Sequence, residues 1–308
     1  MDMNITHSNM PGSSCLVREH DDYVSLSQVS DKRLDALAGN RNPQTIPVRS
    51  TTFAVMSVAH DVLLKVGYEI FPDGPGNQQE AILMSQGLSF KRSMLRQKDG
   101  DNYVESHVSH RYIREIKKYG GGNCYEYASA AMGELYDKKL PLPVFSVKEC
   151  QVDNRNHHYV IVGDWRDRTT GDEAVVVDPW QGLKKIHTYG ERLNQQESPI
   201  PLGVMACGNR LSIFESREMQ RARAQKPMSA EAIQLAMRRA YKDLSELSPG
   251  QIIQELSNNN QSWSSVSGAK NLFTRYQSPD GRSAEFDLAP RSYIATYLQT
   301  RAAQHQTE

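Results

Sequence analysis

Most of the chain shows the apolar spacing of amphipathic helices, in which apolar residues recur every three or four positions. The segments with this spacing are 51–66, 78–93, 104–118, 124–135, 211–223, 229–247, 251–256 and 291–302. Short runs rich in β-branched residues predict strands instead. Those runs are 144–147, 159–162 and 174–177. Because the strands lie between two groups of helices, we expect an α+β fold: a small antiparallel sheet with helical N- and C-terminal additions.

Three segments are expected to interrupt or lack regular structure. Gly67 is predicted to end the helix over 51–66. Residues 1–45 are polar, rich in Ser, Asn and Asp, and poor in large apolar residues, so we expect a disordered leader there. Residues 191–208 contain two prolines and are expected to form a loop.

A glycine turn precedes the helix on which the candidate chemistry depends. The three glycines of 120–122 disfavour a regular helix and indicate a tight turn. Cys124, Ala128, Ala131 and Leu135 then recur at i, i+4, i+7 and i+11, as along one face of a helix. Cys124 is therefore expected in the first helical turn, where free N–H groups and the helix dipole favour a thiolate.

Two histidines and an aspartate flank the strands that follow this helix. His157 and His158 open one predicted strand, and Asp178 closes the next, so antiparallel pairing would bring them together. A thiolate that attacks an acyl carbon needs a histidine to transfer the proton and a carboxylate to orient the histidine. We therefore expect a triad of Cys124, His157 and Asp178. Because side chains alternate along a strand, the two histidines face opposite ways, and His158 stays the alternative base.

Three further features near this set bear on the chemistry. The expected oxyanion donors are the backbone N–H of Cys124 and the side chain of Asn123, since no upstream glutamine is evident. Trp180 lines a substrate cleft or packs the edge of the core, and packing is favoured. Cys150 with the two histidines matches no standard zinc spacing. We therefore expect neither a metal nor another cofactor.

Composition narrows the classes of partner. Lysine plus arginine and aspartate plus glutamate each total 36, so the zero formal net charge gives no reason to expect nucleic acid. Cys15, Cys124, Cys150 and Cys207 are scattered without a CxxC pair, which favours a reducing compartment over a disulfide framework. No apolar run is long enough for a membrane span, and no secretory signal peptide is evident.

Three motifs occur in an order typical of a known group of enzymes. They are Gly122-Asn123-Cys124-Tyr125-Glu126-Tyr127-Ala128, His157-His158-Tyr159-Val160-Ile161-Val162-Gly163 and Val177-Asp178-Pro179-Trp180. Together they resemble the papain-fold, transglutaminase-like cysteine enzymes of bacteria, nearest to plant-pathogen type III effectors of the HopX/XopE kind. The resemblance covers about residues 120–182. It implies a papain-like core in which Cys124 is the nucleophile, His157 the general base and Asp178 the orienting acid.

The resemblance also implies a function and a location. It implies a cysteine hydrolase or acyltransferase, either a deamidase, a thiol protease or a transglutaminase, that acts on a host protein. Such a virulence effector is secreted into the host cell without a cleaved signal, and is otherwise cytoplasmic. Residues 1–45 would then be a type III secretion signal that binds a secretion chaperone. Residues 46–208 would be the catalytic core and 209–308 a mainly helical region packed on it, in a monomer.

Two other interpretations stay open. Arylamine N-acetyltransferases also use a Gly-Gly-x-Cys motif and a Cys-His-Asp set, although their cysteine lies nearer the N-terminus. Outside the enzymes, the chain could be a non-catalytic interaction protein that keeps the fold and binds through its helical C-terminal region. The sequence does not separate a protease from a deamidase or a transglutaminase.

Overall fold

The computed structural model describes residues 23–38, 43–99, 109–150, 156–180, 182–183, 185–192, 198–206, 213–263 and 269–304. The α-helices are α1 (Lys32–Ala38), α2 (Ser50–Leu64), α3 (Gln79–Met84), α4 (Leu88–Asp99), α5 (His110–Tyr119), α6 (Cys124–Leu135), α7 (Ile213–Ala224), α8 (Ala230–Ala240), α9 (Lys242–Ser245), α10 (Pro249–Asn258) and α11 (Arg291–Gln304). The strands are β1 (Tyr23–Val24), β2 (Gln44–Pro47), β3 (Val144–Cys150), β4 (Asn156–Val162), β5 (Val175–Val177), β6 (Ile186–Thr188), β7 (Ile200–Met205), β8 (Thr274–Gln277), β9 (Ser283–Ala284) and β10 (Ala289–Pro290). The predicted α+β class is confirmed.

A five-stranded antiparallel sheet lies at the centre, in the order β6-β5-β4-β3-β7. β3 and β4 pair from Val144↔Val162 to Cys150↔Asn156, and β4 pairs β5 through Ile161↔Val176. The predicted hairpin is therefore present, and β4 begins early enough to include both histidines. β5 in turn ends immediately before Asp178.

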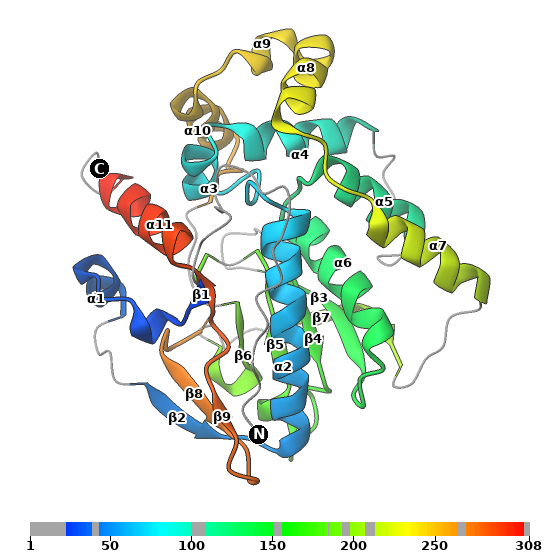
Figure 1. Cartoon of the computed structure of the whole chain (residues 1–308), viewed down its shortest axis with the longest axis vertical. Coiled ribbons are helices and arrows are strands. Elements are labelled where there is room, and N and C mark those ends of the chain that lie inside the picture. Colours follow the sequence, from blue (N-terminus) through cyan, green and yellow to red (C-terminus); the bar gives the residue numbers. More distant parts are fainter. Residues whose placement is uncertain are drawn as a thin grey trace.

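The two faces of this sheet are covered differently. Val160, Val162 and Val175 belong to the main core cluster, which also contains residues of α2 and α6. Those two helices lie side by side against that face (Figure 1). On the other face, Tyr159 and Ile161 belong to a smaller cluster. Because both faces are buried, β4 has a nearly continuous apolar run instead of an alternating pattern.

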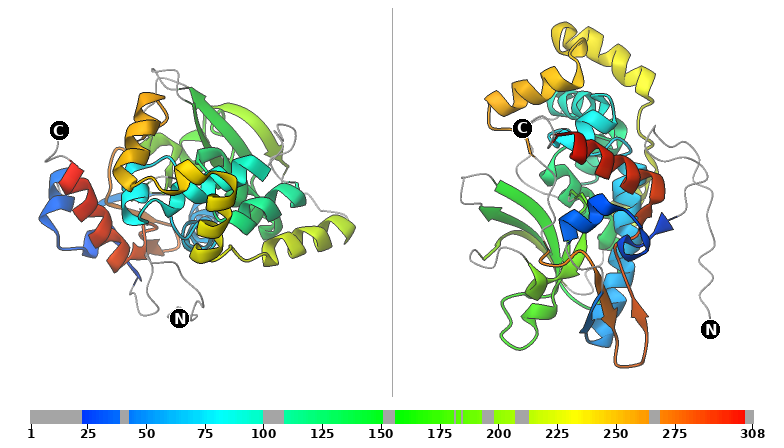
Figure 2. Two further views of the ribbon diagram at one scale, coloured as in Figure 1. Left: turned by 90° about the horizontal axis from the view of Figure 1, so that it is seen from above. Right: turned by 90° about the vertical axis from the view of Figure 1, so that its left-hand side faces the viewer.

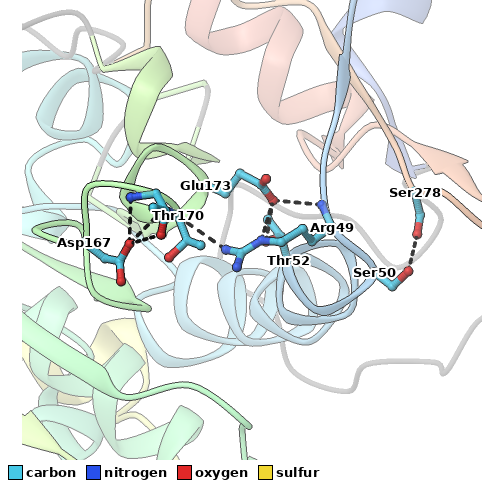
Figure 3. Close-up of polar contacts among 8 residues, drawn as sticks. Arg49, Ser50, Thr52, Asp167, Thr170, Glu173 and Ser278 are labelled. Carbon is cyan, nitrogen blue, oxygen red and sulfur yellow. Dashed lines mark hydrogen bonds and ion pairs between the residues drawn. The ribbon is translucent and has the colours of Figure 1, made fainter.

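The N-terminus of α2 is fixed to the segment that joins β4 and β5. Glu173 Oε2 accepts hydrogen bonds from Arg49 N at 2.8 Å, Arg49 Nε at 3.1 Å and Thr52 Oγ1 at 3.0 Å. Arg49 Nη2 also reaches Thr170 O, and Ser50 meets Ser278 (Figure 3). A carboxylate at a helix N-terminus is favoured by the helix dipole and the free N–H groups. This contact therefore joins α2 to the sheet.

Part of the predicted disordered leader is structured. Residues 1–22 lie outside the described residues, but residues 23–38 form β1, a 3₁₀ turn and α1. Leu26 and Leu34 are fully buried in a cluster that includes Ile294 and Leu298 of α11. Composition alone does not predict this segment. Its few apolar residues become buried only because they pack against α11, a helix near the other end of the chain.

Three local expectations are also corrected. The α2 path does not end at Gly67 but continues as a π-helical turn, Lys65–Ile70. The helix expected over 78–93 is split into α3 and α4, because Gln86 and Gly87 have positive φ values of 52° and 80°. The segment expected to be a loop over 191–208 contains β7, which pairs with β3 at the edge of the sheet.

The remaining elements lie around this core. α7 runs along α5, α8 packs on α4, and α10 packs on α3. α8, α9 and α10 lie at one end of the molecule, and β2, β8 and β9 lie at the other (Figures 1 and 2). Within the described ranges, no helix combines the length and apolar character that a membrane span requires.

Candidate active site

The glycine turn before α6 is required by close packing. Gly120 ends α5 in the left-handed conformation, with a φ of 60°, which glycine adopts at little cost. A Cβ atom on Gly121 would lie 2.4 Å from the Cβ of Arg92, a separation that real Cβ atoms do not show. The Gly122 carbonyl accepts a hydrogen bond from Gly76 N at 3.0 Å. The turn is therefore held on both sides before the chain enters α6 at Cys124.

Glu126 fixes the first turn of α6. Its Oε2 accepts a hydrogen bond from Asn123 N at 2.9 Å, which is one half of a capping box. Its Oε1 accepts from Tyr112 Oη at 3.3 Å and faces Arg96 Nη2 at 3.4 Å. The Arg96 guanidinium also lies over the Tyr112 ring. Because Cys124 is the first residue of α6, the helical geometry provides no acceptor for its N–H.

The Cys124 thiol lies at the point where β4 begins. Its Sγ is 3.9 Å from the carbonyl oxygen of Asn156, the first residue of that strand. The cysteine is free and partly exposed. Cys124 also helps to raise the pKa of the His157 imidazole, the next residue in β4. The fold therefore places the thiol of α6 near the first predicted histidine.

His157 and Asp178 form a buried pair. His157 Nε2 and Asp178 Oδ2 are 2.5 Å apart, and the two residues are 5% and 3% exposed. Because Nε2 is engaged by the carboxylate, Nδ1 is the ring nitrogen left for the thiol. Asp178 is itself held, since its Oδ1 accepts from Trp180 N at 3.2 Å and its own N–H donates to Lys185 O at 2.8 Å.

The charge state of His157 follows from these contacts. Burial alone lowers the pKa of His157, because it disfavours the charged ring. The negative charge and hydrogen bond of Asp178 oppose burial, and the contact with Cys124 adds to them. Together they raise the pKa of His157 to about 10. The imidazole therefore carries its proton at neutral pH.

Two aromatic rings hold the imidazole in place. The Tyr159 ring lies 5.5 Å from the His157 ring at an interplanar angle of 27°. The Trp180 ring lies 5.0 Å away, and Trp180 is only 3% exposed. Its indole N–H donates to Asn77 Oδ1 at 3.2 Å, and its carbonyl accepts from Gln78 Nε2 at 2.5 Å. Trp180 therefore packs over the His157–Asp178 pair, as the favoured interpretation expects.

His158 and Asn123 take different positions from the triad. The His158 ring points to the α6 face of the sheet, where it lies 5.2 Å from the Tyr125 ring in an edge arrangement. The structure therefore brings His157, and not His158, to Asp178. Asn123 precedes the thiol, and its Oδ1 is buried with no hydrogen-bond partner among the described residues. An oxyanion role would require its Nδ2 to face the reacting atom.

Sequence reasoning missed three residues that support this site. Trp263 lies 5.5 Å from Trp180 in an edge arrangement, and its backbone pairs with the Asn77–Gln79 segment. Asn77 and Gln78 hold Trp180, as described above. In the sequence, these two residues are marked only by the strong loop pattern at 71–76 that precedes them. Nothing in the sequence indicates that Trp263 reaches them.

Comparison with protein-family models, with curated proteins and with solved structures finds no match for this chain. The site is therefore interpreted from its own geometry. Among the described residues, no group of three His, Cys, Asp or Glu side chains is arranged to hold a metal ion. The structure describes the backbone of Cys150 in β3 but not its side chain. Cys207 lies outside the described residues.

Proposed function

We propose that the protein is a cysteine-dependent acyl-transfer enzyme with a papain-like or transglutaminase-like core. The observation that supports the proposal most is the position of His157 between Asp178 and Cys124. One ring nitrogen lies 2.5 Å from Asp178, and the Cys124 thiol, bonded to the carbonyl of the preceding residue Asn156, helps to raise the pKa of the ring. A nucleophile, a base and a group that orients the base are the three parts that covalent acyl transfer needs.

The chemistry begins with the thiol proton on His157. The Cys124 sulfur attacks the carbonyl carbon of a carboxamide or peptide, and the carbonyl oxygen becomes an oxyanion. The N–H of Cys124, which has no acceptor within α6, is placed to donate a hydrogen bond to that oxygen. His157 then gives its proton to the departing nitrogen, the C–N bond breaks, and ammonia or an amine leaves from the thioester.

The second half of the reaction restores the enzyme. His157, now neutral, takes a proton from a water molecule as its oxygen attacks the thioester carbon. The C–S bond breaks, the carboxylic acid leaves, and the proton on His157 again pairs with the sulfur. If an amine attacks in place of water, the product is a new amide, and the reaction is transamidation. Asp178 keeps the ring oriented throughout, because Nε2 stays bonded to it.

The environment of the pair suits this cycle. The His157–Asp178 contact is buried, so water does not weaken the hydrogen bond between them. Cys124, in contrast, is partly exposed, which allows a side chain or backbone of a protein substrate to reach the sulfur. The resemblance of the motifs at 120–182 to bacterial effectors supports a protein of a host cell as the substrate.

Mass spectrometry of treated proteins tests the proposal and separates its versions. An extract of plant cells is incubated with the wild-type protein and, as a matched control, with Cys124→Ala. A gain of about one mass unit at glutamine indicates deamidation, new chain termini indicate proteolysis, and amine-linked glutamine indicates transamidation. Each change is expected with the wild type only. Identical peptides from both samples, in extracts of several hosts, would contradict the enzymatic proposal.

A further inference from the structure

The residues that directly follow two members of the candidate triad meet on the α6 face of the sheet. Tyr125 follows Cys124 in α6. His158 follows His157 in β4. The rings of Tyr125 and His158 lie 5.2 Å apart at an interplanar angle of 85°, and Tyr125 also meets the Tyr112 ring at 5.9 Å. Because Tyr125 and His158 are both partly exposed, they form an aromatic surface that a bound molecule can contact.

This aromatic surface lies beside the thiol. Cys124 Sγ is 3.9 Å from the carbonyl oxygen of Asn156. Asn156 precedes His158 by two residues in β4, so their side chains share one face of the sheet, about 7 Å apart along the strand. A substrate chain whose carbonyl carbon reaches the sulfur can therefore contact the aromatic surface within about two residues of the attacked group.

Lys148 stands next to this surface in a cross-strand row. β3 and β4 pair through Lys148↔His158, so the two side chains lie on the same face, with Cβ atoms about 5 Å apart. Val144, four residues earlier in β3, shares that face and belongs to the core cluster that contains residues of α6. The row therefore brings a cation next to the aromatic surface.

The ammonium of Lys148 is accessible to a ligand. The carboxylate of the next residue, Glu149, is engaged on the opposite face, where it pairs with Arg192 at 2.8 Å and accepts from Tyr159 Oη at 3.0 Å. Among the described residues, Lys148 forms no ion pair, and it is partly exposed. Its partner in β7, Ile200, is 52% exposed. The row therefore opens onto the edge of the sheet, where a carboxylate from outside can approach.

We propose that Lys148 is a specificity-determining residue that binds a carboxylate of the protein substrate, while Tyr125 and His158 contact the chain between that carboxylate and the attacked group. This inference rests on the proposed function, because it concerns the substrate of the same thiol. The substrate class is a protein segment with an aspartate or glutamate close to the attacked carboxamide or peptide bond. The attraction between the two opposite charges favours such a segment over a neutral one.

Two alkylating probes that differ by one charge test the inference. N-chloroacetyl-glutamate α-amide and N-chloroacetyl-glutamine α-amide have the same shape, and only the first carries a carboxylate. Their rates with Cys124 are measured by peptide mass spectrometry, and each rate is divided by that of the same probe with N-acetylcysteine. For the wild type we expect a preference of about threefold for the glutamate probe at low ionic strength, which becomes smaller in high salt.

Three variants assign the preference to one side chain. Lys148→Met removes the charge and is expected to abolish the preference, whereas Lys148→Arg keeps the charge and should keep the preference. Lys32→Met is the matched control, because it removes the same charge from α1, away from α6 (Figure 1), and should react as the wild type does. A wild type without a preference, or an unchanged preference in Lys148→Met, would overturn the inference.

The same data separate this inference from the proposed function. The wild-type rate with the neutral glutamine probe reports on the thiol itself. A Cys124 no faster than the other cysteines would overturn the proposed function. The ratio of the two probes depends only on the charges beside Cys124, so it would still decide whether Lys148 selects a carboxylate.

Discussion

The N-termini of α2 and α6 each have a glutamate that accepts the backbone N–H of the residue before the helix, but the glutamates come from different places and only α6 begins with a thiol. At α2 the carboxylate of Glu173 comes from another segment and occupies the N-terminus, accepting from Arg49 N, Arg49 Nε and Thr52 Oγ1. At α6 the carboxylate of Glu126 belongs to the helix itself and bonds outward to Asn123 N. Both carboxylates therefore bind the N–H of the N-cap residue, which is Arg49 in α2 and Asn123 in α6. The first residue of the helix itself is a serine in α2 and a cysteine in α6.

A helix N-terminus is a candidate for reactivity only in combination with the side chains around it. The dipole and the free N–H groups are common to both helices. Only α6 begins with a cysteine, and only there does a neighbouring strand bring a histidine and an aspartate to the same point. The three side chains come from α6, β4 and the turn after β5, so the candidate site depends on the hairpin as well as on the helix.

The largest loss of stability is expected when the turn before α6 is altered. Gly121→Ala places a Cβ atom 2.4 Å from the Arg92 Cβ, inside the buried packing of the turn. We expect the free energy of unfolding to fall by about 2–4 kcal/mol. Gly250→Ala in α10 is the matched control, because a Cβ atom there meets nothing within 4 Å. It should raise stability by about 0.5–1 kcal/mol. Chemical denaturation of both variants measures the difference, and equal stability would contradict the packing described.

Removing one negative charge from each helix N-terminus tests whether the two glutamates affect the thiol differently. Glu126→Gln and Glu173→Gln should each cost about 1–2 kcal/mol of stability, because each weakens a charge-assisted hydrogen-bond cluster. Their effects on the thiol should differ. Glu126→Gln is expected to slow Cys124 alkylation roughly threefold to tenfold, as the turn that carries the cysteine loosens, whereas Glu173→Gln should leave that rate unchanged. Equal effects on the thiol would contradict the placement of Glu126, and not Glu173, beside Cys124.

The Glu173 variant also has a distinct pH dependence. Burial raises the pKa of Glu173, but the hydrogen bonds from Arg49 and Thr52 outweigh burial, so its pKa is lowered from 4.5. A lowered carboxyl pKa stabilises the fold above the unfolded value and loses that contribution as pH falls through the folded value. The wild type should therefore lose stability below about pH 4.5 more steeply than Glu173→Gln. Thermal unfolding between pH 3 and pH 6 provides the measurement, and parallel curves would contradict the assignment.

Local sequence patterns were sufficient to predict the parts of the site that lie close together in the chain. The valine and isoleucine runs of β4 and β5 predict a hairpin, and the hairpin by itself brings His157 toward Asp178. The glycine turn likewise places Cys124 at the start of a helix. These predictions succeed because strand pairing and helix initiation depend on nearby residues.

The rest depends on contacts that no local pattern contains. Trp263 reaches Trp180 from another part of the chain, and Leu26 and Leu34 become buried only when α11 covers them. β7 contains Pro201 and resembles a loop in sequence, yet it pairs with β3, because an edge strand tolerates a residue without an N–H.

The most direct test compares the two histidines through the reactivity of the thiol. The rate of Cys124 alkylation by iodoacetamide at pH 7 is measured by peptide mass spectrometry in the wild type, His157→Ala and His158→Ala, with the other cysteines as references. We predict that His157→Ala slows Cys124 by about a hundredfold and that His158→Ala slows it less than about threefold. Equal rates for the two variants, or a wild-type Cys124 no faster than the reference cysteines, would contradict the account.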